Sequence, residues 1–171
     1  VVALAFAEMQ KAGLAKTARI LLIGAGQTNA LFSKFLQKYD YHHVTVFNRT
    51  FEKAETLANT FQRGRALPFD ALPHFTEGFD ALIVCTGATQ AVVTPALYRS
   101  LLAGETGRKV VVDLSVPNNV DKQILTGFPL RFIEIENLRS TARENLAHRE
   151  REKEKAEAII TRRIYAYRSL W

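Results

Sequence analysis

Cysteine is almost missing from this chain: Cys85 is the only one among 171 residues. A single thiol cannot form an internal disulfide, which favours a reducing compartment, and we expect a cytoplasmic protein. Long hydrophobic runs are absent too. No apolar stretch approaches the roughly eighteen residues that a membrane-spanning helix needs, so we expect no membrane partner. The four histidines show no metal-ligand spacing with cysteine or carboxylates, so no metal site is predicted.

The amino end lacks an initiating methionine and the basic leader of a signal peptide, although Val1 to Ala7 is apolar. We therefore expect a fragment of a longer protein. Hydrophobic residues make up 47% of the chain and include eleven phenylalanines, which is enough material for a substantial core. The net charge of +6 permits contact with a polyanion. However, no basic stretch is interleaved with aromatic residues that stack on bases, which disfavours RNA binding by this chain.

The most informative stretch begins with the branched apolar run Ile20 to Ile23, which stops at Gly24-Ala25-Gly26. A continuous apolar run is typical of a strand buried on both faces of a parallel sheet, and the residues that follow suit an amphipathic helix. Strand, glycine turn and helix together favour a site where a pyrophosphate meets the N–H groups at the start of the helix. Asn29 occupies the third glycine position of this pattern, which serves helix–strand packing, so it weakens the match without removing the binding chemistry.

The second half of the pattern is the position that contacts the ribose. It lies at the end of a second apolar strand, Val44 to Phe47, about twenty residues after the glycine turn. Enzymes that use NAD have Asp or Glu at this point, whereas this strand ends in Asn48-Arg49-Thr50. Arg49 can hold a 2′-phosphate with fork-shaped, charge-assisted hydrogen bonds, and Thr50 and Lys53 can add donors. We therefore predict NADPH rather than NADH as the cofactor. The alternative is that Arg49 is a solvated loop charge and that Thr50 only caps the next helix.

Four further strands are predicted at 65–67, 80–85, 109–114 and 130–133, with helices or turns between them. A helix over 1–13 precedes the first strand, and its all-round apolar character favours packing against a neighbouring domain. Strands that alternate with helices imply right-handed crossovers and a doubly wound parallel sheet in the order 3-2-1-4-5-6, which is a Rossmann-type α/β fold. Ligands of such sheets lie beyond the carboxyl ends of the strands.

Two later loops fall at that same edge, Thr86 to Thr89 and Ser115 to Asn118. Their backbone groups can orient a nicotinamide ring, although each is equally well explained as a glycine or proline turn without a ligand. Asp113 lies in the fifth strand, where a carboxylate is costly to bury without partners, so we expect it to cap nearby N–H groups. Cys85 has no acid–base partner near it in the sequence, and we expect a small core residue rather than a nucleophile.

The chain changes character at 135. Apolar positions at helical spacing lead into the almost entirely charged stretch His148 to Lys155, after which apolar spacing resumes and reaches Trp171. A helix that is polar all round between amphipathic ends usually bridges separate bodies through solvent. We therefore divide the chain into a cofactor-binding domain over 1–134 and a long linking helix over 135–171, which leads toward another domain or a dimer partner. A frayed, disordered end is the alternative.

Five motifs, taken in their order along the chain, resemble one known family. They are GAGQTN after the first strand, FNRTFEKAETLA at the end of the second, VCTGA after the fourth, DLSVPNNVD after the fifth, and ENLAHREREKEKAEAII in the terminal helix. In this order they resemble glutamyl-tRNA reductase over essentially the whole chain. The part that is similar is the NADPH-binding domain together with the start of the long spinal helix.

The resemblance implies an oxidoreductase that reduces glutamyl-tRNA to glutamate-1-semialdehyde, the entry step to tetrapyrroles, the porphyrins among them. It implies that a cysteine in an N-terminal domain binds the glutamyl group as a thioester, that NADPH supplies hydride, and that a C-terminal domain forms a homodimer. Neither flanking domain lies in this chain, and Cys85 does not match the nucleophile. We therefore expect no catalytic residue here and no activity from this chain alone.

By the same match, the cofactor-binding residues form three groups, for the pyrophosphate, the 2′-phosphate side and the nicotinamide side. In that order they are Gly24, Ala25, Gly26, Gln27 and Thr28; Asn48, Arg49, Thr50 and Lys53; and Thr86, Gly87, Ala88, Val116 and Pro117. Two other interpretations stay open. One is a shikimate dehydrogenase-like NADP reductase, whose cofactor site also uses an N-R-T turn, and the other is a dinucleotide-sensing module without enzymatic activity.

Overall fold

A six-stranded, entirely parallel sheet organises the computed structural model, which describes residues 1–169. Its strands are β1 (Ile20–Ile23), β2 (His43–Asn48), β3 (Arg63–Pro68), β4 (Ala81–Val84), β5 (Lys109–Asp113) and β6 (Leu130–Glu134). They lie in the order β3-β2-β1-β4-β5-β6. This confirms the predicted Rossmann-type fold and the predicted strand order. The described residues form two units, 1–135 and the helical segment that begins at Glu136, so the apolar position predicted at Trp171 lies outside them.

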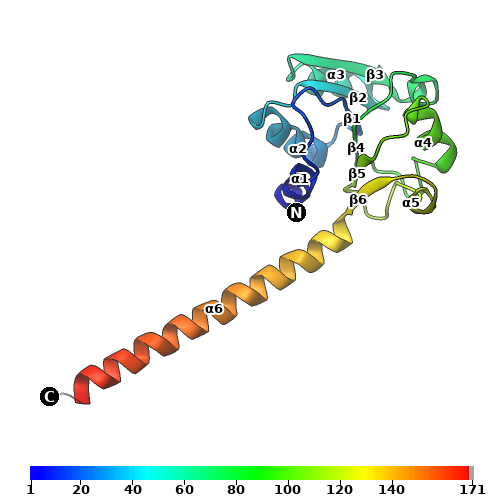
Figure 1. Ribbon diagram of the computed structural model, residues 1–171. Coiled ribbons are helices and arrows are strands. Elements are labelled where there is room, and N and C mark those ends of the chain that lie inside the picture. Colours follow the sequence, from blue (N-terminus) through cyan, green and yellow to red (C-terminus); the bar gives the residue numbers. More distant parts are fainter. Residues whose placement is uncertain (170–171) are drawn as a thin grey trace. The chain divides into compact units, whose positions relative to one another are not determined.

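The helices of the first unit cover both faces of the sheet. They are α1 (Val2–Gln10), α2 (Gln27–Lys38), α3 (Phe51–Ala58), the 3-10 helix η1 (Phe69–His74), α4 (Pro95–Leu102) and α5 (Ile124–Gly127). Helices α1 and α2 lie on one face and α4 and α5 on the other (Figure 1). This double cover explains why every residue of β1, β4 and β5 is buried and why β1, β4 and the centre of β5 read as continuous apolar runs.

The register of the sheet sets which loops meet at its carboxyl edge. Ile23, the last residue of β1, pairs with Phe47 on one side and with Val84 on the other. The residues that follow these three positions are therefore neighbours in space, although they are far apart in the sequence. In this way the glycine turn after β1, the turn after β2 and the turn after β4 come together at one edge.

Helix α1 packs within the first unit, where its buried residues are Ala5, Phe6 and Met9. The ring of Phe6 contacts the rings of Phe32, Phe35 and Tyr39, with centroids 5.7, 5.5 and 5.1 Å apart. Helix α1 also contacts β5 and β6. The apolar composition of this segment is therefore explained by its position over α2 and the edge of the sheet.

Two elements differ from the sequence-based expectation. Strand β3 extends from Arg63 to Pro68 because it pairs with β2 along its whole length. A proline is tolerated at the end of this edge strand, where no neighbouring strand needs its missing N–H. Helix α5 was not predicted, and its single turn is too short to show an apolar period.

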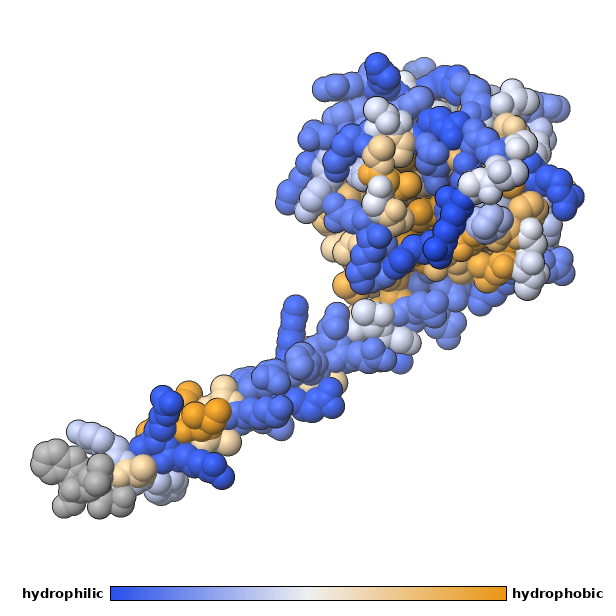
Figure 2. Space-filling model, in the orientation of Figure 1, coloured by the Kyte–Doolittle hydropathy of each residue, from blue (hydrophilic) through white to orange (hydrophobic). Residues whose placement is uncertain are grey.

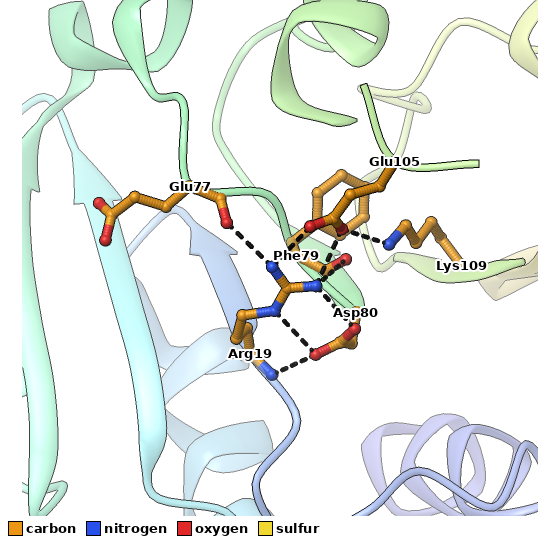
Figure 3. Close-up of polar contacts among 6 residues, drawn as sticks. All are labelled: Arg19, Glu77, Phe79, Asp80, Glu105 and Lys109. Carbon is orange, nitrogen blue, oxygen red and sulfur yellow. Dashed lines mark hydrogen bonds and ion pairs between the residues drawn. The ribbon is translucent and has the colours of Figure 1, made fainter. Parts of the chain in front are cut away.

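An ionic cluster ties together the amino ends of three strands (Figure 3). Arg19 precedes β1, and its guanidinium donates hydrogen bonds to Asp80 at 3.0 and 3.1 Å and to Glu105 at 2.7 and 2.8 Å. Lys109, at the start of β5, donates to Glu105 at 2.6 Å. The hydrogen bonds from Arg19 and then from Lys109 lower the pKa of Glu105 to about 2. The cluster lies at the opposite edge from the glycine turn, so it supports the fold and not a ligand site.

The second unit is formed by α6 (Ile135–Ser169) from Glu136 onward. This helix confirms the predicted long C-terminal helix. Figure 2 shows apolar side chains gathered on this helix among charged ones. Large apolar side chains of this helix that are about half exposed or more are Leu146, Ile159, Ile160, Ile164, Tyr165 and Tyr167. Among the described residues, no helix combines the length and the apolar character needed to cross a membrane.

Candidate functional site

A cavity of about 490 Å³ opens at the carboxyl edge of the sheet, where the turns after β1, β2 and β4 meet. Every cofactor residue predicted from the sequence lines it except Val116 and Pro117. The lining residues are Gly24, Ala25, Gly26, Gln27, Thr28, Asn48, Arg49, Thr50, Lys53, Phe69, Cys85, Thr86, Gly87, Ala88 and Val92. Sequence reasoning missed Phe69 and Val92 as lining residues and assigned Cys85 to the core.

The floor of the cavity depends on Gly24. Its φ of 103° lies in the region that side chains disfavour, and a Cβ placed there would lie 1.9 Å from the carbonyl oxygen of Cys85. Its N–H donates to the carbonyl of Phe47 at 2.8 Å. Only glycine allows the chain to turn this tightly between β2 and β4.

Gly26 has a different role because it is not strained. It is the N-cap of α2 with a φ of −81°, and a Cβ at this position would meet no atom within 4 Å. No side chain caps the helix. The first N–H groups of α2 therefore face the cavity side without a side-chain acceptor, and the bare Cα leaves room for an anion to approach them.

Asn29, which weakens the match to the glycine pattern, hydrogen-bonds to the turn. The side chain is fully buried, and its Nδ2 donates to the carbonyl oxygens of Ile23 at 3.1 Å and Gly24 at 2.8 Å. The third glycine of the dinucleotide pattern permits close packing, whereas here an amide fills that space and hydrogen-bonds to the end of β1. Helix and strand are thus joined by polar contacts.

Asn48 joins the two turns that form one side of the cavity. Its Oδ1 accepts from the N–H of Ala25 at 3.1 Å, and its Nδ2 donates to the carbonyl of Thr50 at 2.9 Å. Both ends of its amide therefore have protein partners. Asn48 holds the glycine turn in register with the residues that follow β2.

The same side of the cavity carries two cations and no carboxylate. Arg49 and Lys53 are exposed lining residues, and none of the other lining residues is acidic. Thr50 stands at the N-cap of α3, but its hydroxyl makes no capping hydrogen bond, so capping does not account for this residue. An excess of positive charge next to the N-terminus of α2 suits a ligand with several phosphate groups.

The opposite side is the turn Thr86 to Ala88, and a buried amide sets its shape. Asn119 Oδ1 accepts from the N–H of Thr86 at 3.1 Å and from its hydroxyl at 2.7 Å, while Nδ2 donates to the carbonyl of Ala88 at 3.0 Å. Sequence reasoning missed Asn119, which lies in the loop after β5. The structure does not bring Val116 or Pro117 of that loop into the cavity lining, and the side chain of Val116 is 68% exposed.

Asp113 caps N–H groups as predicted. Its carboxylate is fully buried at the end of β5 and accepts from the backbone N–H groups of Ser115 at 3.0 Å and of Asn119 and Val120, both at 2.9 Å. Burial raises the pKa of this carboxyl above its ordinary value, and the three hydrogen bonds oppose that shift. The residue therefore shapes the loop that holds Asn119.

Cys85 is not the buried core residue that we expected. It follows β4, is half-buried and lines the cavity, and its thiol donates to the carbonyl of Leu114 at 3.6 Å. Burial raises the pKa of the thiol, which disfavours the nucleophilic thiolate. Within residues 1–169 there is no group of three or more His, Cys, Asp or Glu side chains that could hold a metal ion.

Comparison with known proteins places this geometry in a family. The family model described as shikimate / quinate 5-dehydrogenase matches residues 6–141. The chain belongs to this family. Among curated relatives, glutamyl-tRNA reductase of Sulfurihydrogenibium sp. is 32% identical over 149 residues, which are 87% of this chain and 34% of the relative. The chain thus spans about a third of the length of the curated relatives that it matches.

The comparison with solved structures also finds glutamyl-tRNA reductase. Glutamyl-tRNA reductase from Methanopyrus kandleri matches with a TM-score of 0.74 and 28% identity, over 91% of this chain and 40% of that one. These relatives confirm the resemblance to glutamyl-tRNA reductase. Shikimate 5-dehydrogenase from Thermus thermophilus, in complex with NADP(H) and shikimate, has a TM-score of 0.52 and 19% identity over 76% of this chain and 49% of that one, which shows a shared fold.

Proposed function

We propose that this chain is the NADPH-binding domain of a glutamyl-tRNA reductase, with the cofactor-binding part at 1–134 and a linking helix at 135–171. The observation that carries the proposal is that Arg49 and Lys53 both line the cavity beside the glycine turn, and that no lining residue has a carboxylate. A carboxylate at this position would repel the 2′-phosphate that distinguishes NADPH from NADH, whereas two cations attract it.

The cavity fits NADPH group by group. The pyrophosphate belongs at Gly26 and the first turn of α2, where a Cβ is absent and the N–H groups are uncapped. The 2′-phosphate belongs at Arg49, Thr50 and Lys53, and the nicotinamide end against the turn Thr86 to Ala88. When bound, the cofactor supplies a hydride. The contribution of the chain is to hold it, and we assign no catalytic role to any described residue.

The names of the relatives support a wider activity. We propose that the domain serves a protein that reduces glutamyl-tRNA to glutamate-1-semialdehyde for tetrapyrrole synthesis in the cytoplasm. In this proposal another domain binds the tRNA and carries the nucleophile. The exposed apolar side chains of α6, Ile160 and Ile164 among them, support a homodimer in which this helix leads toward the dimerising part.

Calorimetric titration of the 171-residue chain with NADP⁺ and with NAD⁺ tests the cofactor assignment. We expect NADP⁺ to bind at least about tenfold more tightly, because one charge-assisted hydrogen bond is worth about 1.5–3 kcal/mol. Equal affinities, or no binding of either nucleotide, would contradict the proposal.

A chimera tests the reaction. The chain replaces the matching segment of the Sulfurihydrogenibium reductase. NADPH oxidation is followed with glutamyl-tRNA as substrate, and NADP⁺ reduction is followed with shikimate as substrate. We expect NADPH oxidation with glutamyl-tRNA and no NADP⁺ reduction with shikimate. A chimera that binds NADPH but responds to shikimate would instead support the shikimate dehydrogenase-like interpretation.

A further inference from the structure

Arg49 lies against an aromatic ring that the sequence did not associate with it. The guanidinium carbon is 5.3 Å from the centroid of the Phe69 ring, a distance at which a cation is attracted to the face of the ring. The sheet dictates this contact. Asn48 at the end of β2 pairs with Pro68 at the end of β3, so the next residue of each strand, Arg49 and Phe69, lies beside the other.

The two partners differ in how firmly they are held. Phe69 is the first residue of η1, is half-buried and packs against the core cluster that contains Leu72 and Phe75. Its ring lines both the nucleotide cavity and a neighbouring apolar groove that includes Leu72 and Leu97. Arg49 is exposed. The ring is therefore held by the core, and the exposed guanidinium lies over it.

The guanidinium keeps its donors available. Within the part of the chain that the structure describes, Arg49 forms no ion pair with a carboxylate, unlike Arg19 and Arg131. Contact with a ring face leaves the N–H groups in the plane of the guanidinium free to donate to an anion. A long side chain that is already positioned loses less conformational freedom when it binds, which raises affinity.

We propose that Phe69 is a specificity-determining positioning residue: it holds the guanidinium of Arg49 at the rim of the cavity, ready for the 2′-phosphate of NADPH. This inference rests on the proposed function of the cavity, and it adds a residue that acts through Arg49. Removing the ring should therefore weaken the binding of the phosphorylated nucleotide and leave the other unchanged. A ring that only filled space, or that stacked on the adenine, would affect both nucleotides equally.

Calorimetry with NADP⁺ and NAD⁺ on the 171-residue chain tests the inference. Phe69→Leu keeps an apolar side chain against the core but removes the ring face, and we expect an about three- to tenfold weaker affinity for NADP⁺ with NAD⁺ unchanged within about twofold. Phe69→Tyr keeps the face and should retain the preference of the unmodified chain. In an Arg49→Ala background, Phe69→Leu should have no further effect on NADP⁺, because the group that it positions is gone.

Phe128→Leu is a matched control. Phe128 is also half-buried and lies 5.6 Å from the guanidinium carbon of Arg99, but it does not line the nucleotide cavity. It should leave the ratio of the two affinities unchanged. Equal losses of affinity for both nucleotides in Phe69→Leu, or no loss for either, would overturn the positioning role of Phe69. If Arg49→Ala abolished the preference for NADP⁺ in the same experiments, the proposed function would still stand. If the unmodified chain binds neither nucleotide, the proposed function and this inference fail together.

Discussion

The hydroxyl of Thr86 donates a hydrogen bond of 2.7 Å to the side-chain oxygen of Asn119. Thr86 follows β4 and Asn119 follows β5, so this contact joins the two loops that the pairing of those strands brings to one edge. The same oxygen accepts from Ser115 at 2.6 Å, and the amide nitrogen donates to the carbonyls of Ala88 and Gln90. One fully buried side chain thus fixes a wall of the cavity.

Asn119→Ala should weaken the binding of NADP⁺ and NAD⁺ by a similar factor, because the wall that it releases faces a part common to both nucleotides. The buried N–H and hydroxyl groups left without a partner should also lower the free energy of unfolding by about 1–3 kcal/mol. Calorimetry and urea denaturation measure the two effects. Asn118→Ala is the control, since Asn118 contacts Glu134 and not the Thr86 turn, and it should keep the affinity. An Asn119→Ala chain that binds both nucleotides normally would refute this role.

Arg49→Ala should weaken NADP⁺ by about tenfold to a hundredfold, because a charge-assisted contact with the 2′-phosphate is lost, and should barely change NAD⁺. Competitive titration of the two nucleotides measures the change. Arg63→Ala removes the same charge from an exposed position at the opposite end of β3 and should have no effect on the ratio. Comparable losses for both nucleotides would rule out a 2′-phosphate partner at this position.

The sequence predicted those parts of the cavity whose chemistry lies within a few consecutive residues. The turn at Gly24 to Gly26 and the run from Asn48 to Lys53 are local patterns, and strand length and apolar runs are enough to place them at one edge. Phe69 and Asn119 were missed because their roles arise between segments that only the sheet register brings together. Neither residue lies in a periodic pattern that would mark it.

Asn29 shows a different limit of sequence reasoning. A motif position says which space must be filled, and glycine is expected where a helix approaches a strand closely. It does not say that an amide of the right reach can occupy that space by donating to the carbonyls of Ile23 and Gly24. In the sequence, Asn29 is therefore a mismatch to the glycine pattern. In the structure, its side chain joins α2 to the end of β1 by hydrogen bonds.

The two glycines of the turn should respond in opposite ways to alanine. Gly24→Ala places a Cβ 1.9 Å from the carbonyl of Cys85 at a φ of 103°, so we expect a loss of folded protein. Gly26→Ala meets no atom within 4 Å and should fold with nearly the same stability. It should nevertheless bind NADP⁺ more weakly, because its methyl group lies where the pyrophosphate approaches. Thermal unfolding and calorimetry on both variants separate the effects, and a Gly26→Ala chain with unchanged affinity would contradict the assignment of the pyrophosphate site.

The ionic cluster at the other edge should make stability depend on pH through Glu105. Its pKa is about 2 in the folded chain, against an ordinary value of 4.5 for an unperturbed glutamate side chain. Between these values the unfolded chain binds the proton and the folded chain does not, so stability falls as the pH decreases through this range. Above it, the contribution of Glu105 is fully present.

Glu105→Gln should therefore lower the free energy of unfolding at about pH 6 by about 1 kcal/mol, a modest value because the side chain is 32% exposed and screened by solvent. The difference from the unmodified chain should shrink at about pH 2.5, because Glu105 of the unfolded chain binds a proton there and the advantage of the folded carboxylate falls. Urea denaturation across this range measures both. Glu55→Gln, which changes an exposed glutamate of α3 and leaves the cluster intact, should keep the acid sensitivity of the unmodified chain. A difference for Glu105→Gln that stayed constant down to low pH would show that its carboxylate is not held by Arg19 and Lys109.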